Sequence, residues 1–137
     1  MATRSRIGLR LADDSILSVY HHWDGYPEWL GVTLKTKFNT REKVAELIDG
    51  GDMASCDSND DWDRKELGET APLYYNDRGE KTEPRLDLNE DDFFANGEEY
   101  AYIFDPYESA WECYDLHGIS PKRVNIPSEH PKELNVS

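Results

Sequence analysis

The 137-residue chain carries 15 Lys and Arg against 29 Asp and Glu, which gives a formal charge of −14. Direct binding to nucleic acid or to an anionic membrane needs a cationic surface, so this balance argues against both. Its length fits one domain with a single core. Aromatic residues make up 12% of the chain, far more than in a disordered protein, and predict a small folded core under a charged surface.

The sequence shows neither an N-terminal signal-peptide pattern nor a membrane-spanning one. The N-terminus lacks the apolar stretch of a signal peptide, and every apolar run is shorter than the roughly 18 residues that cross a bilayer. We therefore expect a soluble, cytoplasmic protein. Cys56 and Cys113 are far apart in sequence, so we expect two free thiols and neither a disulfide framework nor a zinc site.

Two strands are expected first along the chain. Apolar residues alternate with polar or small ones over residues 6–11, which is typical of a strand with one buried face. Residues 13–15 favour a turn, and the β-branched and aromatic residues of 16–23 predict a returning strand. Gly25 and Pro27 end this hairpin because Pro supplies no ladder donor.

Helical patterns follow the hairpin. Residues 29–38 place apolar side chains four positions apart, a weak helical face. Thr40 precedes a stronger amphipathic stretch over residues 41–48, which Gly50 and Gly51 end. Residues 56–70 are polar, acidic and aperiodic, and predict a loop.

The second half predicts a strand at residues 73–75, a turn at 76–79 and a short helix at 90–95, which Asn89 begins. Residues 100–104 and 110–114 predict a second hairpin, and a short strand near 124–126 falls in a loosely ordered segment, 121–137. The expected fold is one α+β domain over residues 1–137. Its antiparallel sheet comes from two hairpins, covered by one or two short helices.

Residues 21–27 concentrate histidines, a carboxylate and large aromatics at a strand end, where functional loops commonly lie. Adjacent histidines on a strand point to opposite faces, so His21 and His22 cannot both bind one ion. The segment is interpreted either as a structural corner or as a functional loop. The residues of that candidate loop are His22, Trp23, Asp24, Gly25, Tyr26 and Pro27.

Several segments together resemble a family of small bacteriophage-encoded accessory proteins of unassigned function: residues 5–8, Tyr20, 22–27, 39–44, 51–53 and 76–80. The likeness is close over roughly the first 55 residues and loose beyond them. It brings no catalytic residues with it. It implies expression in the cytoplasm of an infected bacterium, where small acidic proteins often block host enzymes or defences.

Charge placement is the second feature of interest. No Lys or Arg occurs between Arg85 and Lys122, whereas ten carboxylates do. On one hairpin and one short helix they could form a negative surface that attracts a cationic protein, with Tyr and Trp as anchors. The alternative is a solvated face that keeps the domain soluble. The candidate partner-binding residues are Asp87, Glu90, Asp91, Asp92, Glu98, Glu99, Tyr102, Tyr107, Glu108, Trp111, Glu112 and Tyr114.

Metal chemistry is less favoured by the sequence. Residues 87–98 match several ligand positions of an EF-hand calcium loop, but Asp92 occupies the position where glycine makes the sharp turn. A second match starts at residue 57, and there Trp62 occupies the glycine position. The chain also lacks a Gly-rich phosphate loop and a G-x-S-x-G motif. We therefore predict no metal and no cofactor.

The leading hypothesis is a phage-encoded acidic protein that inhibits or redirects a basic, nucleic-acid-binding host protein in host takeover or anti-defence. One form of this hypothesis is a DNA mimic. One alternative is a small metal-dependent hydrolase that uses carboxylates with His21 or His22. Another is a virion or assembly protein. The hypothesis requires that the carboxylates gather on one exposed patch and are not neutralised by the arginines of the first strand.

Overall fold

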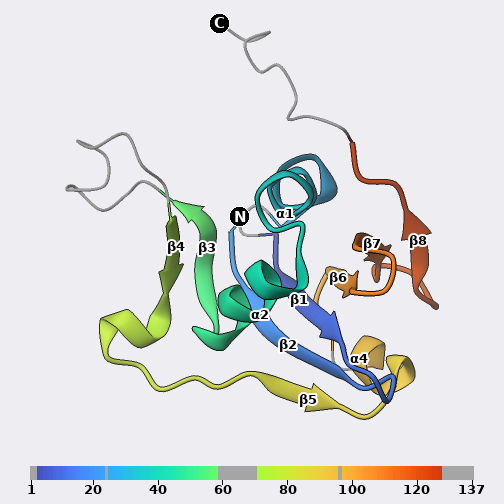
Figure 1. Cartoon of the computed structure of the whole chain (residues 1–137). Helices are drawn as coiled ribbons and strands as arrows, with labels where there is room; N and C mark the ends of the chain where they lie inside the picture. The colour runs from blue at the N-terminus through green and yellow to red at the C-terminus, as the bar shows by residue number, and fades with distance from the viewer. Residues whose placement is uncertain (1–2, 24, 59–70, 96, 128–137) are drawn as a thin grey trace, which may run out of the picture.

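The predicted N-terminal hairpin is present, and the rest of the sheet is built on it (Figure 1). The computed structural model describes residues 3–23, 25–58, 71–95 and 97–127. Strands β1 (Ser5–Arg10) and β2 (Ile16–His21) pair antiparallel over their whole length. The fold class is α+β in a single domain, as predicted.

The second predicted hairpin extends the sheet on the β1 side. Strands β6 (Tyr100–Asp105) and β7 (Ala110–Asp115) pair antiparallel, and β8 (Lys122–Val124) adds to β7. β6, however, runs parallel to β1. A parallel neighbour needs a long crossover, and the chain between β2 and β6 supplies it.

The other side of the sheet holds three further strands. β3 (Met53–Ser58) pairs parallel to the end of β2, β4 (Ala71–Tyr74) pairs with β3, and β5 (Arg85–Asp87) pairs antiparallel to the start of β2. The strand order is β4-β3-β2-β1-β6-β7-β8, with β5 beside β2. The expectation of a purely antiparallel sheet is therefore wrong, because local alternation predicts strands but not the direction in which distant ones meet.

Three helical segments cover one face of the sheet. One turn of π-helix, η1 (Pro27–Gly31), continues directly into α1 (Val32–Lys37), which confirms the weak helical pattern over this region. α2 (Arg41–Asp49) begins where Thr40 Oγ1 accepts a hydrogen bond from the backbone N–H of Lys43 at 3.2 Å. Its apolar stripe, Val44, Leu47 and Ile48, is buried against the sheet.

The core has two parts. The larger lies between the sheet and these helices and includes Ile7, Val19, Leu34 and Phe104. The smaller lies on the opposite face, under α4 (Glu90–Ala95), and consists of Ile16, Phe93, Ala101 and Ile103. Central strands β1 and β6 are thus covered on both faces.

Some predictions differ from the structure or lie outside its described part. β3 includes residues 56–58, which the polar composition assigned to a loop, and the described 3-10 turn η2 (Tyr75–Arg78) follows β4. β8 begins two residues before the strand expected near 124–126. Asp24, Trp62 and residues 128–137 lie outside the described residues.

Candidate partner-binding surface

α4 holds its carboxylates in place through a cap and a buried aromatic. Asn89 Oδ1 accepts a hydrogen bond from the backbone N–H of Asp92 at 2.9 Å, so the helix begins where the sequence predicts. Phe93 is fully buried beneath it. A Cβ at Gly8 of β1 would lie 2.7 Å from Ile16 Cγ2, so the glycine leaves room for Ile16, which packs with Phe93 under α4. Asp91 and Asp92 remain exposed.

Sheet register brings further carboxylates to the same end of the molecule. Because β1 and β6 are parallel neighbours, the β1–β2 turn and the β6–β7 turn lie at one end of the sheet. β5 runs antiparallel to β2 and also finishes there, so α4 starts at that end. We call this region the acidic end; its exposed or half-exposed carboxylates are Asp13, Asp14, Glu90, Asp91, Asp92, Asp105 and Glu108.

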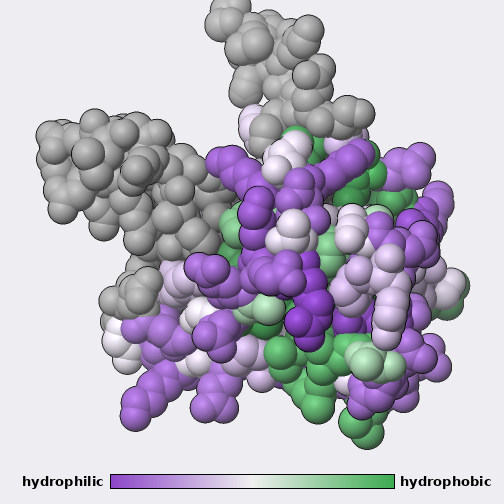
Figure 2. All heavy atoms as spheres, viewed as in Figure 1, coloured by the Kyte–Doolittle hydropathy of each residue, from purple (hydrophilic) through white to green (hydrophobic). Residues whose placement is uncertain are grey.

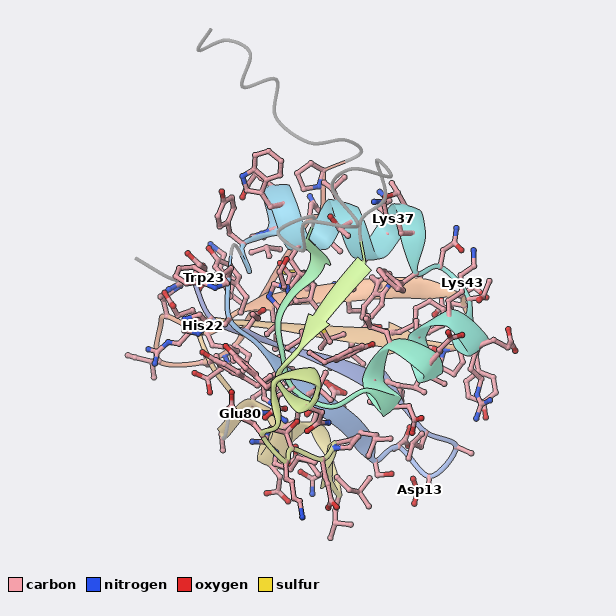
Figure 3. The ribbon with its side chains drawn as sticks, turned by 90° about the vertical axis from the view of Figure 1, so that its left-hand side faces the viewer. Asp13, His22, Trp23, Lys37, Lys43 and Glu80 are labelled. Atoms are coloured by element: carbon pink, nitrogen blue, oxygen red, sulfur yellow. The ribbon has the colours of Figure 1, made fainter. Side chains whose placement is uncertain are left out.

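Arg10 partly neutralises this region. Its Nη2 lies 3.1 Å from Glu90 Oε2 and 4.0 Å from Glu112 Oε1, and its side chain is mostly buried. Arg10 and Glu90 border an open hollow of about 330 Å³, together with Asp14, Asn89 and Asp91. The exposed carboxylates of Asp91 and of the two turns carry charge beyond this pairing. Lys37 and Lys43 belong to helices α1 and α2, and Figure 3 shows both away from Asp13.

The other predicted carboxylates do not join this patch. Asp87 is only 7% exposed and pairs with Arg85 at 2.9 Å, so it is not available to a partner. Glu98 and Glu99 lie at the opposite end of the sheet, where Arg4 approaches them at 3.9 and 3.8 Å. The prediction of one patch containing all the carboxylates is therefore wrong, since arginines distant in sequence reach several of them.

An exposed histidine completes the cluster at that opposite end. His117 Nδ1 lies 2.6 Å from Asp115 Oδ1, and its Nε2 lies 3.3 Å from Glu99 Oε1. These carboxylates raise the pKa of His117. The backbone N–H of Arg4 donates to Glu99 and lowers the pKa of that carboxyl. This cluster ties the start of the chain to β6 and β7.

Two of the predicted aromatic anchors are buried. Tyr102 is fully inaccessible, and its hydroxyl donates to the carbonyl of Gly25 at 2.7 Å. Trp111 is 9% exposed, and its indole N–H donates to the carbonyl of Phe38 at 2.7 Å. Both side chains point to the sheet face that the helices cover, so the prediction that they contact a partner is wrong.

The remaining two aromatics differ in exposure. Tyr114 is half-buried: its ring packs on Phe94 with centroids 4.8 Å apart, and its hydroxyl donates to Glu112 at 2.8 Å. Tyr107, in the β6–β7 turn beside Glu108, is 79% exposed. Of the four predicted anchors, Tyr107 is thus the one with most of its surface open to a partner.

Parts of this surface, namely the first hairpin turn and the leucines in and directly after β5, are not predicted from the sequence. Asp13 and Asp14 belong to the first hairpin turn. The parallel β1–β6 pairing places them near the carboxylates of the β6–β7 turn, and the β2–β5 pairing places them near those of α4. Leu86 and Leu88, which flank buried Asp87, are 52% and 71% exposed. Figure 2 shows a hydrophobic area in this region with hydrophilic side chains around it. The alternation of β5 was too short to detect in the sequence.

The histidines of residues 21–27 lie on opposite faces of the sheet, as predicted. His21 is buried on the helical side, and burial lowers its pKa to about 3, so the folded protein holds it neutral. On the other side, the Tyr20 hydroxyl and His22 Nδ1 are 2.6 Å apart. The Trp23 ring packs edge-on against His22 at 4.6 Å, near the surface (Figure 3).

Backbone contacts make the rest of this segment a corner. The N–H of Gly25 donates to the carbonyl of Thr3 at 2.9 Å, and a Cβ on Gly25 would lie 2.5 Å from Ser5 Oγ. Only glycine fits so close to β1. The chain then turns through Tyr26 and Pro27 into η1. These contacts favour the interpretation of the segment as a structural corner.

A metal-binding cluster is not found in the part of the chain that the structure describes. There, no three His, Cys, Asp or Glu side chains are grouped so that they could hold a metal ion. Cys113 is a buried free thiol whose pKa burial raises to about 12, so it is protonated and a poor nucleophile. Within the same described ranges, no helix has the length and apolar character to cross a membrane.

Comparisons of the chain with known protein families, with curated proteins and with solved structures give no match. The interpretation of the surface therefore depends on its own geometry. That geometry consists of carboxylates from three separate segments at one end of the sheet, with mostly buried Arg10 paired to Glu90 among them, and exposed Leu88 and Tyr107 nearby in sequence.

Proposed function

We propose that this protein is a phage-encoded binding protein that docks its acidic end against a basic host protein and inhibits or redirects it. The observation that carries the proposal is the gathering of carboxylates from the two turns and α4 at one end of the sheet. Like charges in proximity repel one another, and a cationic partner relieves that repulsion on binding. A negative surface also steers such a partner into contact and speeds association.

Host proteins that bind nucleic acid are the partners that fit this chemistry best. Their binding grooves are lined with Lys and Arg that neutralise phosphates. An acidic protein surface can occupy such a groove in place of DNA or RNA, with its carboxylates in the role of phosphates. The resemblance to phage accessory proteins supports a bacterial host as the setting.

The exposed apolar side chains add the second component of a protein interface. Interface energy usually comes from a few apolar or aromatic residues that become desolvated, with charged residues around them. Tyr107 lies in the same turn as Glu108, and Leu88 lies next to the cap of α4. Both side chains are largely exposed in the free protein.

A charge-neutralisation experiment with a matched control tests the proposal. The triple variant Asp14→Asn, Asp91→Asn and Glu108→Gln removes three charges from the acidic end. The control triple Glu42→Gln, Glu46→Gln and Asp49→Asn removes three exposed charges from α2 on the helical face. Asparagine at position 14 keeps a side chain that tolerates the positive φ of 69° found there.

Both variants and the unmodified protein are used to capture proteins from a bacterial lysate over a series of salt concentrations. We expect the unmodified protein and the control triple to retain the same basic protein at low salt and release it at high salt. The acidic-end triple should retain at most a small fraction of it. Equal capture by the two triples, or capture that salt does not affect, would contradict the proposal.

A further inference from the structure

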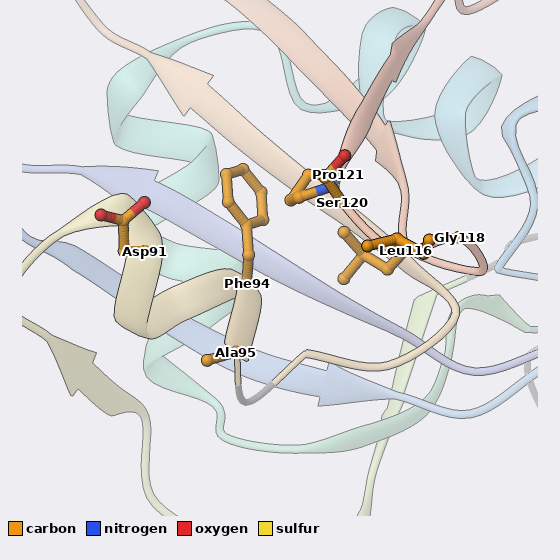
Figure 4. A pocket seen from close by; sticks show the side chains of 8 residues that line it. Asp91, Phe94, Ala95, Leu116, Gly118, Ser120 and Pro121 are labelled. Atoms are coloured by element: carbon orange, nitrogen blue, oxygen red, sulfur yellow. The ribbon is translucent and has the colours of Figure 1, made fainter.

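An open groove lies between α4 and the connection from β7 to β8 (Figure 4). Its volume is about 290 Å³. Phe94 and Leu116 are half-buried and form its floor, and exposed Ala95 and Ile119 lie at its rim. Asp91, on the first turn of α4, lines one end of the groove.

The floor of the groove is fixed by packing rather than formed by mobile side chains. The Phe94 ring is held between Phe93, at 5.6 Å, and Tyr114, at 4.8 Å between centroids. The backbone N–H of Leu116 donates to the carbonyl of Glu99 at 3.0 Å. Binding of a partner therefore does not require the free energy that ordering these side chains would cost.

Ile119 is the most exposed large apolar residue of those described, with a relative accessibility of 108%. An aliphatic side chain in this position gains free energy when a partner covers it. The groove is at the small limit of pockets that enclose drug-sized ligands, and it is open to solvent. Its dimensions suit one or two side chains of a protein segment.

Charge decides which kind of segment fits. Asp91 borders both this apolar groove and the neighbouring hollow, which is also lined by Asp14, Glu90 and Arg10, so that its carboxylates outnumber its one arginine. An apolar side chain seated on Phe94 would thus place the residues next to it close to these carboxylates. Lys or Arg at those positions complements the surface, whereas Asp or Glu would be repelled.

We propose that the groove binds a segment of a cationic protein in which an aliphatic or aromatic residue stands within a few positions of Lys or Arg. This inference rests on the proposed function and specifies how the partner docks. The apolar side chain contacts Phe94, Leu116 and Ile119, and the neighbouring cations contact Asp91 and the acidic hollow.

Three fluorescent nine-residue peptides test the inference on the intact protein by fluorescence anisotropy. The first has a central Leu between Lys and Arg residues, the second replaces that Leu by Ser, and the third keeps Leu but replaces the cations by Gln. We expect the first to bind about tenfold more tightly than the second, the effect of burying one leucine. The third should bind at least tenfold more weakly than the first.

Substitutions at the exposed rim test whether the preference for the Leu peptide over the Ser peptide comes from the groove. Ile119→Ser and Ala95→Gln should each reduce the Leu-over-Ser preference to about twofold while both basic peptides still bind in a salt-sensitive way. Trp23→Ser is the matched control: it removes an exposed apolar side chain at the opposite end of β2, outside both the groove and the acidic end, and should keep the full preference.

Equal binding of the Leu and Ser peptides to the unmodified protein would overturn the inference, as would a preference that survives both rim variants. In either case salt-sensitive binding of the basic peptides would leave the proposed function standing. If no basic peptide binds, the inference fails, and the lysate experiment with the two charge triples decides separately whether the proposed function fails with it.

Discussion

Buried His21 should make the folded protein less stable under mildly acidic conditions. Burial lowers the pKa of this imidazole to about 3, from an ordinary value of 6.5 in the unfolded chain. Between these two values the unfolded state binds a proton that the folded state excludes, so the free energy of unfolding falls as the pH falls. For these two pKa values, the loss between pH 7 and pH 5 is about 2 kcal/mol.

Urea unfolding at pH 7, 6 and 5, followed by tryptophan fluorescence, measures this loss. The comparison is with His21→Gln, which cannot titrate at this position. Other ionisable groups are the same in both proteins, so the difference between their pH dependences isolates His21. We expect the variant to lose about 2 kcal/mol less than the unmodified protein between pH 7 and pH 5, whatever its stability at pH 7.

Parallel pH dependences of the two proteins would refute the reasoning. They would mean that the His21 side chain is hydrated or charged in the folded protein. The test is insensitive to how much the substitution itself disturbs the core, because only the change with pH is compared.

Three further predictions concern stability. The pKa of His117 is shifted in the opposite direction to that of His21, so protonation of His117 stabilises the folded protein. His117→Gln should therefore increase the stability that the protein loses between pH 7 and pH 5. In the same urea experiment the increase should be roughly a few tenths of a kcal/mol, because the ion pairs are exposed. Gly8→Ala should lower the free energy of unfolding by about 1–3 kcal/mol, because its Cβ would lie 2.7 Å from Ile16 Cγ2; an unchanged urea midpoint would contradict this. Tyr102→Phe removes a buried hydroxyl that donates to a backbone carbonyl and should cost about 1 kcal/mol in thermal and urea unfolding, whereas Tyr107→Phe, at an exposed site, should cost nothing measurable.

The elements predicted most accurately are those with complete local signals. Thr40 caps α2 and Asn89 caps α4, each through a side-chain oxygen that accepts from a backbone N–H three residues later. A cap and the residues it serves are close in sequence, so the pattern can be recognised without knowledge of the rest of the fold. β5, with three residues, has no such signal, because it forms only where β2 offers an edge.

The candidate surface was only partly predictable, because charge and burial depend on neighbours distant in sequence. The interval without Lys or Arg is a true feature of the chain, yet Arg4 reaches Glu98 and Glu99, and Arg10 reaches Glu90. The aromatic content of the second hairpin likewise suggested exposed anchors. Tyr102 lies instead on a strand covered on both faces.

Composition and local patterns are enough to predict the acidic character of the protein, its α+β class, both hairpins and the start of each capped helix. These properties follow from composition and from interactions within a few residues. Tertiary packing sets β6 parallel to β1, which brings the turn that carries Glu108 to the end of the sheet where Asp14 lies. It also pairs β5 with β2, which starts α4, with Asp91 and the groove beside it, at that same end. The direction in which distant strands meet depends on packing across the whole core, and no local pattern encodes it.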